Sequence, residues 1–313
     1  MTSFLFGIEV IFPVFFVIIV GIFLRKKEIV DQEFMSQAST LVFYFALPLK
    51  LFLDIYNSDL SNGINGTFTI TIILLTLVTF ILGWTLAIFA VERSKRSAFI
   101  HTAFRSNFVY VGYPIIATLI GSTSHPAIIS VNLFILPLYN FLAIMALGYY
   151  GKATNGLASV VKSTLKNPMV IGTFLGIMAY FLPLEFPQPL LKGMTLFSSL
   201  ATPLALLLIG MQLGQYFDRI PFAAILSGGF CVLIRPLIAI PILHMLSFTY
   251  EEFIVGLVLF TTPCAANSYV MTRKMGGDGD FAAKSILSSF LINIFSYPII
   301  IYILQQFGWI YSL

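Results

Sequence analysis

Long uninterrupted apolar segments constrain this chain more than any other feature of its sequence. Several of them reach the roughly 18 to 20 residues that an α-helix needs to cross a bilayer. They do not alternate apolar and polar residues, as the strands of a membrane barrel would. Hydrophobic residues make up 58% of the 313 residues, and charged residues only 10%. The sequence therefore predicts an all-α integral membrane protein, because helices satisfy their own backbone hydrogen bonds in lipid.

The apolar segments predict ten transmembrane helices. They cover residues 4–24, 35–56, 67–91, 101–121, 126–150, 168–185, 191–213, 221–248, 251–272 and 281–307. No basic segment precedes the first, and Arg25, Lys26 and Lys27 follow it. We therefore interpret it as a retained span and not as a signal peptide.

Lysine and arginine residues are distributed unequally between the connections. Nearly all of those near span ends fall in one alternate set, and the other set holds only Lys192. Because basic connections stay in the cytoplasm, we expect a multi-pass protein of the cytoplasmic (inner or plasma) membrane with both termini outside. The longest connection, 151–167, is then a cytoplasmic loop. The net charge of +4 lies in these short connections, so it does not indicate a nucleic-acid partner.

The long loop separates two halves of five spans each, 1–150 and 168–313. An odd number of spans per half requires the second half to enter the membrane upside down. The halves also share short motifs, because "FALPLKLFL" at 45–53 resembles "LATPLALLL" at 200–208. Pro48 and Pro203 have the same separation as Gly121 and Gly276. These features predict two inverted five-helix repeats, an arrangement typical of secondary transporters.

The fourth span contains residues that a simple lipid-facing helix does not need. Pro114 has no N–H group, Gly112 allows the backbone to open, and Asn107 offers both a donor and an acceptor. We expect the helix to break near Gly112 and Pro114. A helix broken near the middle of the membrane is a suitable place to bind a polar solute, because its freed backbone groups need partners.

The ninth span repeats this pattern in "LFTTPCAANSYVMTRKMGGD" at 259–278. We expect its polar and proline residues to complete the substrate site: Thr262, Pro263, Asn267 and Ser268. Interrupted spans in corresponding positions of two halves indicate the binding site of a carrier. After it, the sequence "GGDGD" predicts that glycine ends this span and that Asp280 caps the tenth.

The chain resembles the auxin efflux carrier family, which includes plant auxin exporters and bacterial malate permeases. The resemblance rests on "VFYFALPLKLF", "SNFVYVGYPIIATLIG", "KNPMVIGTFLG", "LLLIGMQL" and "TPCAANSYVMTRKMGGD" in this order. It implies that broken helices 4 and 9 cross, and that Asn107 and Pro114 match the family's pattern. It also implies a scaffold domain of spans 1, 2, 6 and 7, a transport domain of spans 3–5 and 8–10, elevator-like motion, a homodimer and a small organic anion such as a carboxylate as substrate.

Charged residues inside spans indicate a functional or structural role, because inserting an arginine at the bilayer centre costs about 2.5 to 3.5 kcal/mol of free energy. Arg235 either supports the crossing of the broken helices, contacts the anion, or lies at the interface. Arg105 either extends to the interface or forms an inner gate that attracts anions. Lys50 and Asp54 are four residues apart on one helical face, and we expect them to form a local ion pair.

The sequence does not decide whether an ion gradient drives transport, or which ion. Spans 3, 4, 5, 8, 9 and 10 hold no deep acidic residue, so a buried-carboxylate proton site is not supported. Weak candidates for sodium coordination are the oxygen atoms of Ser106, Ser130 and Asn132, together with Asn107 and Asn267. Three scattered histidines and two cysteines, Cys231 and Cys264, suggest no metal site, cofactor or enzyme. We therefore expect a secondary carrier of a small organic anion. The alternatives are a sodium- or proton-coupled carrier of another solute and a channel-like pore.

Overall fold

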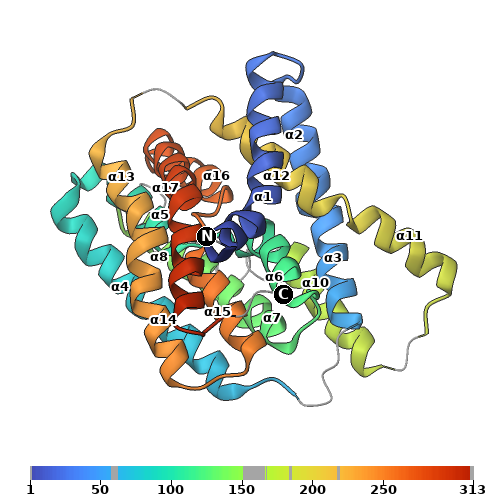
Figure 1. The fold of residues 1–313 in the computed structure, drawn as a ribbon. Helices are drawn as coiled ribbons and strands as arrows, with labels where there is room; N and C mark the ends of the chain where they lie inside the picture. Colours follow the sequence, from blue (N-terminus) through green and yellow to red (C-terminus); the bar gives the residue numbers. More distant parts are fainter. Residues whose placement is uncertain are drawn as a thin grey trace.

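The structure is a computed structural model that describes residues 2–57, 63–150, 166, 168–182, 185–216 and 219–310. Within these ranges the chain is helical, with one isolated β-bridge (Figure 1). Of the predicted loop 151–167, only Lys166 lies among the described residues.

Seven helices of the described chain are long and apolar enough to cross a bilayer. They are Leu5–Lys26, Gln32–Tyr56, Gly66–Ala90, Pro126–Tyr150, Gln188–Leu213, Phe222–Met245 and Gly279–Gln306. Shorter apolar helices cover Phe108–Ile120 and Pro168–Phe181. The predicted all-α multi-pass membrane protein is confirmed at this level.

Several spans are assembled from shorter elements. In chain order the helices are α1 (Thr2–Lys26), α2 (Gln32–Leu41), α3 (Leu47–Tyr56), α4 (Gly66–Ala90), α5 (Arg93–Phe104), α6 (Tyr113–Ile120), α7 (Pro126–Ser130), α8 (Leu136–Tyr150), α10 (Pro168–Phe181), α11 (Gln188–Ser198), α12 (Ala201–Leu213), α13 (Phe222–Gly229), α14 (Arg235–Met245), α15 (Tyr250–Thr261), α16 (Asn267–Lys274) and α17 (Gly279–Gln306).

Three of four π-helical segments join two of these helices, and the fourth, η2, extends α6 at its N-terminal end. The four segments are η1 (Val42–Ala46), η2 (Phe108–Gly112), η3 (Val131–Ile135) and η4 (Phe230–Ile234). Each ends two residues before a proline, namely Pro48, Pro114, Pro137 and Pro236. A proline removes one helical hydrogen bond and crowds the preceding turn, and a wider π-turn accommodates it. These prolines therefore widen their helices without interrupting them.

The prediction of a break at Gly112 and Pro114 is therefore wrong, because the helix is continuous there. The fourth span begins earlier than predicted, with α5, and the chain leaves the helix at Arg105, whose backbone is extended. Hydropathy missed the start of α5 because residues 97–104 are buried among neighbouring helices and need not be lipid-compatible. The ninth span does break near the predicted position, between α15 and α16.

Two glycines end these broken spans in the same way. Gly121 after α6 has φ 78°, and Gly276 after α16 has φ 77°. This left-handed conformation suits glycine, which has no Cβ. The prediction that glycine ends the ninth span is confirmed. The predicted cap of α17 is wrong, because Asp278 and not Asp280 accepts the hydrogen bond, from the N–H of Phe281 at 2.9 Å.

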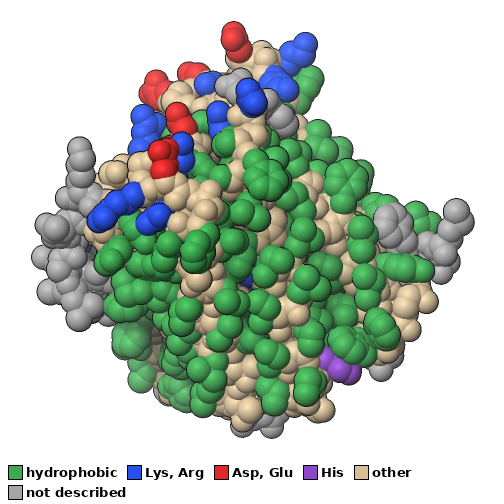
Figure 2. Space-filling model, turned by 90° about the vertical axis from the view of Figure 1, so that its left-hand side faces the viewer, with side chains coloured by type: hydrophobic (Ala, Val, Ile, Leu, Met, Phe, Trp, Pro, Cys, Tyr) green, Lys and Arg blue, Asp and Glu red, His purple; other side chains and the backbone are tan. Residues whose placement is uncertain are grey.

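Charged side chains gather at one end of the molecule, above a broad apolar surface (Figure 2). Many large hydrophobic side chains of the described residues are exposed, including Phe89, Phe222 and Leu237. An apolar surface of this extent is expected where helices face lipid.

Small residues let α1 and α12 pack backbone against backbone. A Cβ atom on Gly210 would overlap the carbonyl oxygen of Ile18, and one on Gly21 would overlap that of Leu207. Close helix contacts through small residues are a common device in membranes.

We expect Gly210→Leu to separate these helices and to lower the yield of folded protein severalfold, because overpacking costs about 1–3 kcal/mol or more. Fluorescence-detected gel filtration would measure the folded fraction. Gly193→Leu is the matched control, because Gly193 is exposed and has open space around its Cβ position. Equal yields for the two variants would contradict the close contact.

Candidate functional site

The two broken spans meet at their breaks. The N–H of Asn107 donates to the carbonyl of Pro263 at 2.8 Å, and the N–H of Ala265 donates to the carbonyl of Arg105 at 3.1 Å. These bonds form an antiparallel bridge between Ser106 and Cys264. Two extended segments inside the protein thus supply hydrogen-bond partners for each other's backbone groups, as buried backbone requires.

Side chains from neighbouring helices satisfy the remaining groups around Pro263. Because proline has no N–H, the carbonyl of Leu259 lacks its helical donor. Arg235 Nη2 donates to this carbonyl at 3.0 Å instead. Asn293 Nδ2 donates to the carbonyl of Thr261 at 2.8 Å, and Ser289 Oγ accepts from the N–H of Cys264 at 3.0 Å. The break in the ninth span is therefore held by α14 and α17.

Arg235 is fully buried and has several further contacts. Its Nη2 donates to the hydroxyl of Tyr139 at 3.3 Å, and its Nη1 lies 3.2 Å from the sulfur of Cys231. The guanidinium lies 5.4 Å from the ring centre of Phe260. Tyr139 in turn donates to Ser106 Oγ at 3.4 Å. Arg235 thus contacts both broken spans, directly or through Tyr139, and it is enclosed by protein.

A cleft of about 760 Å³ lies beside the breaks. It is lined by residues of α2, η1 and α12 and by Arg105 together with residues of η2, α8 and α16. Gln32, Gln215 and Lys274 line it near the basic connections. From there the cleft reaches Arg105 at the break of the fourth span. It therefore connects the interior to the end of the molecule that carries the basic connections, here called the basic end.

Arg105 is the buried cation of this cleft, with 7% of its surface exposed. Its Nη2 donates to Asn140 Oδ1 at 3.0 Å. Its Nη1 lies 3.3 Å from His101 Nε2 and 3.6 Å from the sulfur of Met271. No carboxylate of the described residues lies within 4.0 Å of the guanidinium. The side chain of Arg105 is thus enclosed by protein, and the cleft contains a positive charge that no described acidic residue balances.

The other predicted site residues divide into two groups. Asn267 lines the cleft, and its Oδ1 is buried without a hydrogen-bond partner among the described residues. The remaining ones do not line the cleft and lie in the breaks, in η2 and α6, or in α16: Asn107, Gly112, Pro114, Thr262, Pro263 and Ser268. Among these, Asn107 keeps a buried Nδ2 without a partner in the described chain.

Sequence reasoning missed several polar residues of the cleft. Asn140, Gln212 and Gln215 line it, and Asn140 contacts Arg105. The available signal was weak, because Asn140 and Gln212 are isolated amides in the apolar fifth and seventh spans, and Gln215 lies just after the seventh. Gln212 does belong to "LLLIGMQL", one of the motifs on which the family resemblance rests.

The weak sodium candidates belong to separate groups. Ser106 accepts from Tyr139, and Ser130 donates to the carbonyl of Pro126 in its own helix at 3.3 Å. Asn132 donates to the hydroxyl of Tyr113 at 2.6 Å. The three residues have different hydrogen-bond partners, and the sodium site stays a prediction.

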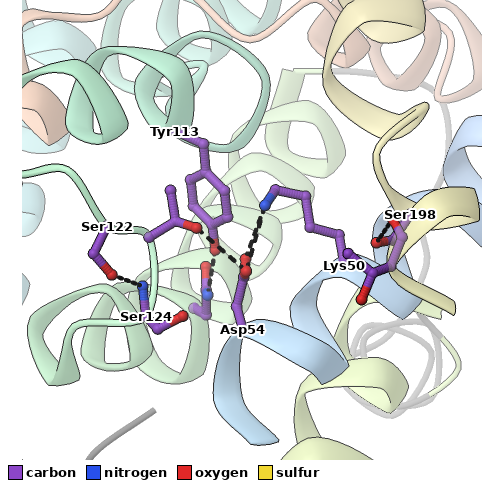
Figure 3. Close-up of polar contacts among 9 residues, drawn as sticks. Lys50, Asp54, Tyr113, Ser122, Ser124 and Ser198 are labelled. Carbon is purple, nitrogen blue, oxygen red and sulfur yellow. Dashed lines mark hydrogen bonds and ion pairs between the residues drawn. The ribbon is translucent and has the colours of Figure 1, made fainter. Parts of the chain in front are cut away.

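A second polar cluster lies on α3, which leads away from the basic end (Figure 3). Lys50 Nζ is 3.3 Å from Asp54 Oδ2, so the predicted ion pair is confirmed. Thr123 Oγ1 donates to Asp54 Oδ1 at 3.3 Å, and Lys50 Nζ lies 5.4 Å from the ring centre of Tyr113. The cluster therefore connects α3 to α6 and to the segment that follows α6.

Comparisons with known proteins agree with a transport role. The profile of the family described as "Membrane transport protein" matches residues 6–301. An "Uncharacterized transporter" of Methanocaldococcus jannaschii is 25% identical over 316 residues, which cover 96% of this chain and 98% of that protein. A "Putative malonate transporter" of Rhizobium meliloti is 23% identical over 309 residues, which cover 95% of each chain. The chain therefore belongs to this membrane transport family, the auxin efflux carrier family that its motifs resemble.

Proposed function

We propose that this protein is a secondary carrier of a small organic anion, which binds in the cleft at Arg105. One observation carries the proposal: a guanidinium with 7% exposure lines a cleft and has no described carboxylate within 4.0 Å. A buried charge is expensive unless it is paired. A substrate carboxylate would supply the missing negative charge, and the planar fork of arginine matches its two oxygens.

Other groups of the cleft suit the same ligand. Helix α16 begins at Asn267, and Ala266 and Asn267 both line the cleft. The positive end of a helix dipole favours an anion. The amides of Asn267 and Gln212 can donate hydrogen bonds to hydroxyl or carboxylate oxygens of the solute. Because the name of the Rhizobium relative includes malonate, a short dicarboxylate is the first compound to test.

The proposal includes ten membrane-crossing segments as two inverted repeats, 1–150 and 168–313. The moving transport domain contains spans 3–5 and 8–10, and the scaffold contains spans 1, 2, 6 and 7. In support, the cleft is lined both by α2, η1 and α12, which belong to spans 2 and 7, and by Arg105, α8 and α16, which belong to spans 4, 5 and 9. The cleft opens toward the basic end, and the Lys50–Asp54 cluster joins the two groups of spans far from it.

This arrangement corresponds to a carrier whose site faces the cytoplasm, and an elevator-like movement of the transport domain would expose the site on the other side. In this orientation both termini are outside. The family resemblance further suggests a homodimer in the cytoplasmic membrane.

Transport by proteoliposomes tests the proposal. We expect labelled malonate to enter at a saturable rate, and unlabelled malonate inside the vesicles to accelerate this entry by exchange. Malate, auxin-like acids and an uncharged malonate diester would serve as competitors, and empty vesicles as the control. A flux that is linear in concentration and insensitive to internal malonate would indicate a pore. If no organic acid is transported or competes, the anion proposal fails.

A further inference from the structure

His101 is a buried residue to which neither the sequence nor the comparisons assign a role. It lies on α5, one helical turn before Arg105, and its side chain is fully buried. Its Nε2 is 3.3 Å from Arg105 Nη1, and its Nδ1 is 3.2 Å from Thr272 Oγ1 on α16. His101 thus connects Arg105 to the helix whose first residue lines the cleft.

The chemistry of the partners determines where the imidazole carries its proton. A guanidinium has only N–H donors, so the His101 nitrogen that faces it has to accept a hydrogen bond. In a neutral imidazole the other nitrogen then carries the proton. We infer that His101 is a positioning residue, held as the neutral Nδ1–H tautomer, that orients Arg105 toward the substrate. The positioning role rests on the proposed function, whereas the tautomer does not.

The hydrogen bonds of Arg105 define the edge that it presents to the cleft. Nη1 uses its two protons on His101 and Met271, and Nη2 uses one on Asn140. The second Nη2 proton and the Nε proton have no hydrogen-bond partner among the residues that the structure describes. Nε and Nη2 form the side edge of the guanidinium, where a carboxylate accepts two parallel hydrogen bonds. We take the proton that Nη2 donates to Asn140 to be the one on the side of Nη1, so that His101 and Asn140 hold the guanidinium with this edge free for an anion.

Nitrogen-15 NMR of the purified protein with labelled histidine tests the tautomer without any transport assay. The chain has three histidines, His101, His125 and His244, so the signals that disappear in His101→Asn identify His101. We expect a protonated Nδ1 and an unprotonated Nε2 at neutral pH. A protonated Nε2, alone or together with Nδ1, would overturn the inference.

Two variants that differ in one methylene test the positioning role. In His101→Gln, Oε1 takes the place of Nε2 and can accept from Arg105. In His101→Asn, the amide reaches only the place of Nδ1 and can contact only Thr272. We expect His101→Asn to raise the KM for malonate about tenfold and to keep the maximal rate within about threefold of wild type. A loss of affinity of about tenfold is expected when a charged group loses one hydrogen bond. We expect His101→Gln to keep both constants within about threefold.

Equal KM values for the two variants would overturn the positioning role, whether both match wild type or both are raised. Thermal unfolding of the two proteins shows whether a common loss comes from misfolding. If the wild-type protein transports no organic acid, the proposed function fails, and the NMR experiment still decides the tautomer of His101.

Discussion

Replacing Arg105 with glutamine should reduce the transport of a carboxylate at least about thirtyfold. Removing one partner of a buried charge pair costs about 2 kcal/mol or more, and each 1.4 kcal/mol is about tenfold. Arg105→Lys keeps the charge but loses the planar edge, so we expect an intermediate loss of about tenfold. Initial uptake rates of labelled malonate, measured over a range of concentrations, would give these ratios.

Lys274→Gln is the matched control for this prediction. Lys274 lines the same cleft and carries the same charge, but its side chain is exposed. A solvated charge contributes little to binding, so we expect a change below about threefold. If Lys274→Gln reduced transport as much as Arg105→Gln, the general positive potential of the cleft would be responsible, and a specific contact at Arg105 would be excluded.

Replacing Arg235 with methionine should strongly reduce transport for a different reason. The substitution leaves the carbonyl of Leu259 without a donor inside the protein, and Pro263 cannot supply one. A buried unsatisfied group costs about 1–3 kcal/mol. We therefore expect a rearranged break, a lower melting temperature and transport reduced at least about tenfold. Arg235→Lys should retain part of the activity, because an ammonium group can reach one acceptor but not all.

Melting temperature and uptake, measured on the same preparations, distinguish support of the break from contact with the substrate. Support predicts that Arg235→Met becomes less stable in the absence of any substrate. Leu237→Ala is the control, because Leu237 lies on the same helix and is exposed. An Arg235→Met protein with wild-type stability and a raised KM would contradict support and would indicate that Arg235 contacts the anion.

The sequence predicted the helical membrane fold well, because continuous hydropathy is a local property of each span. It placed the break of the fourth span too late, since the proline rule identifies Pro114 as a helix breaker. In the structure, η2 accommodates Pro114, and the break at 105–107 results from pairing with Pro263 and Ala265. That pairing joins residues far apart in the chain, so no local pattern could reveal it.

The site was predicted in part for a similar reason. The sequence identified Arg105 and Asn267, but it could not decide whether Arg105 reaches the interface or faces inward. That choice depends on the start of α5, which has low hydropathy and is buried by other helices. Asn140 and His101, which hold the guanidinium, come from α8 and from the preceding turn of α5. A single polar residue in an apolar span does not indicate its partner.

An experimental structure with a bound substrate analogue would test the central claim most directly. We would use 2-bromomalonate, provided that it competes with malonate for uptake, because anomalous scattering from bromine marks its position. We expect a carboxylate within hydrogen-bond distance of Nε and Nη2 of Arg105, with Asn267 nearby. An analogue bound away from Arg105, for example between Lys50 and Tyr113, would contradict the proposed site.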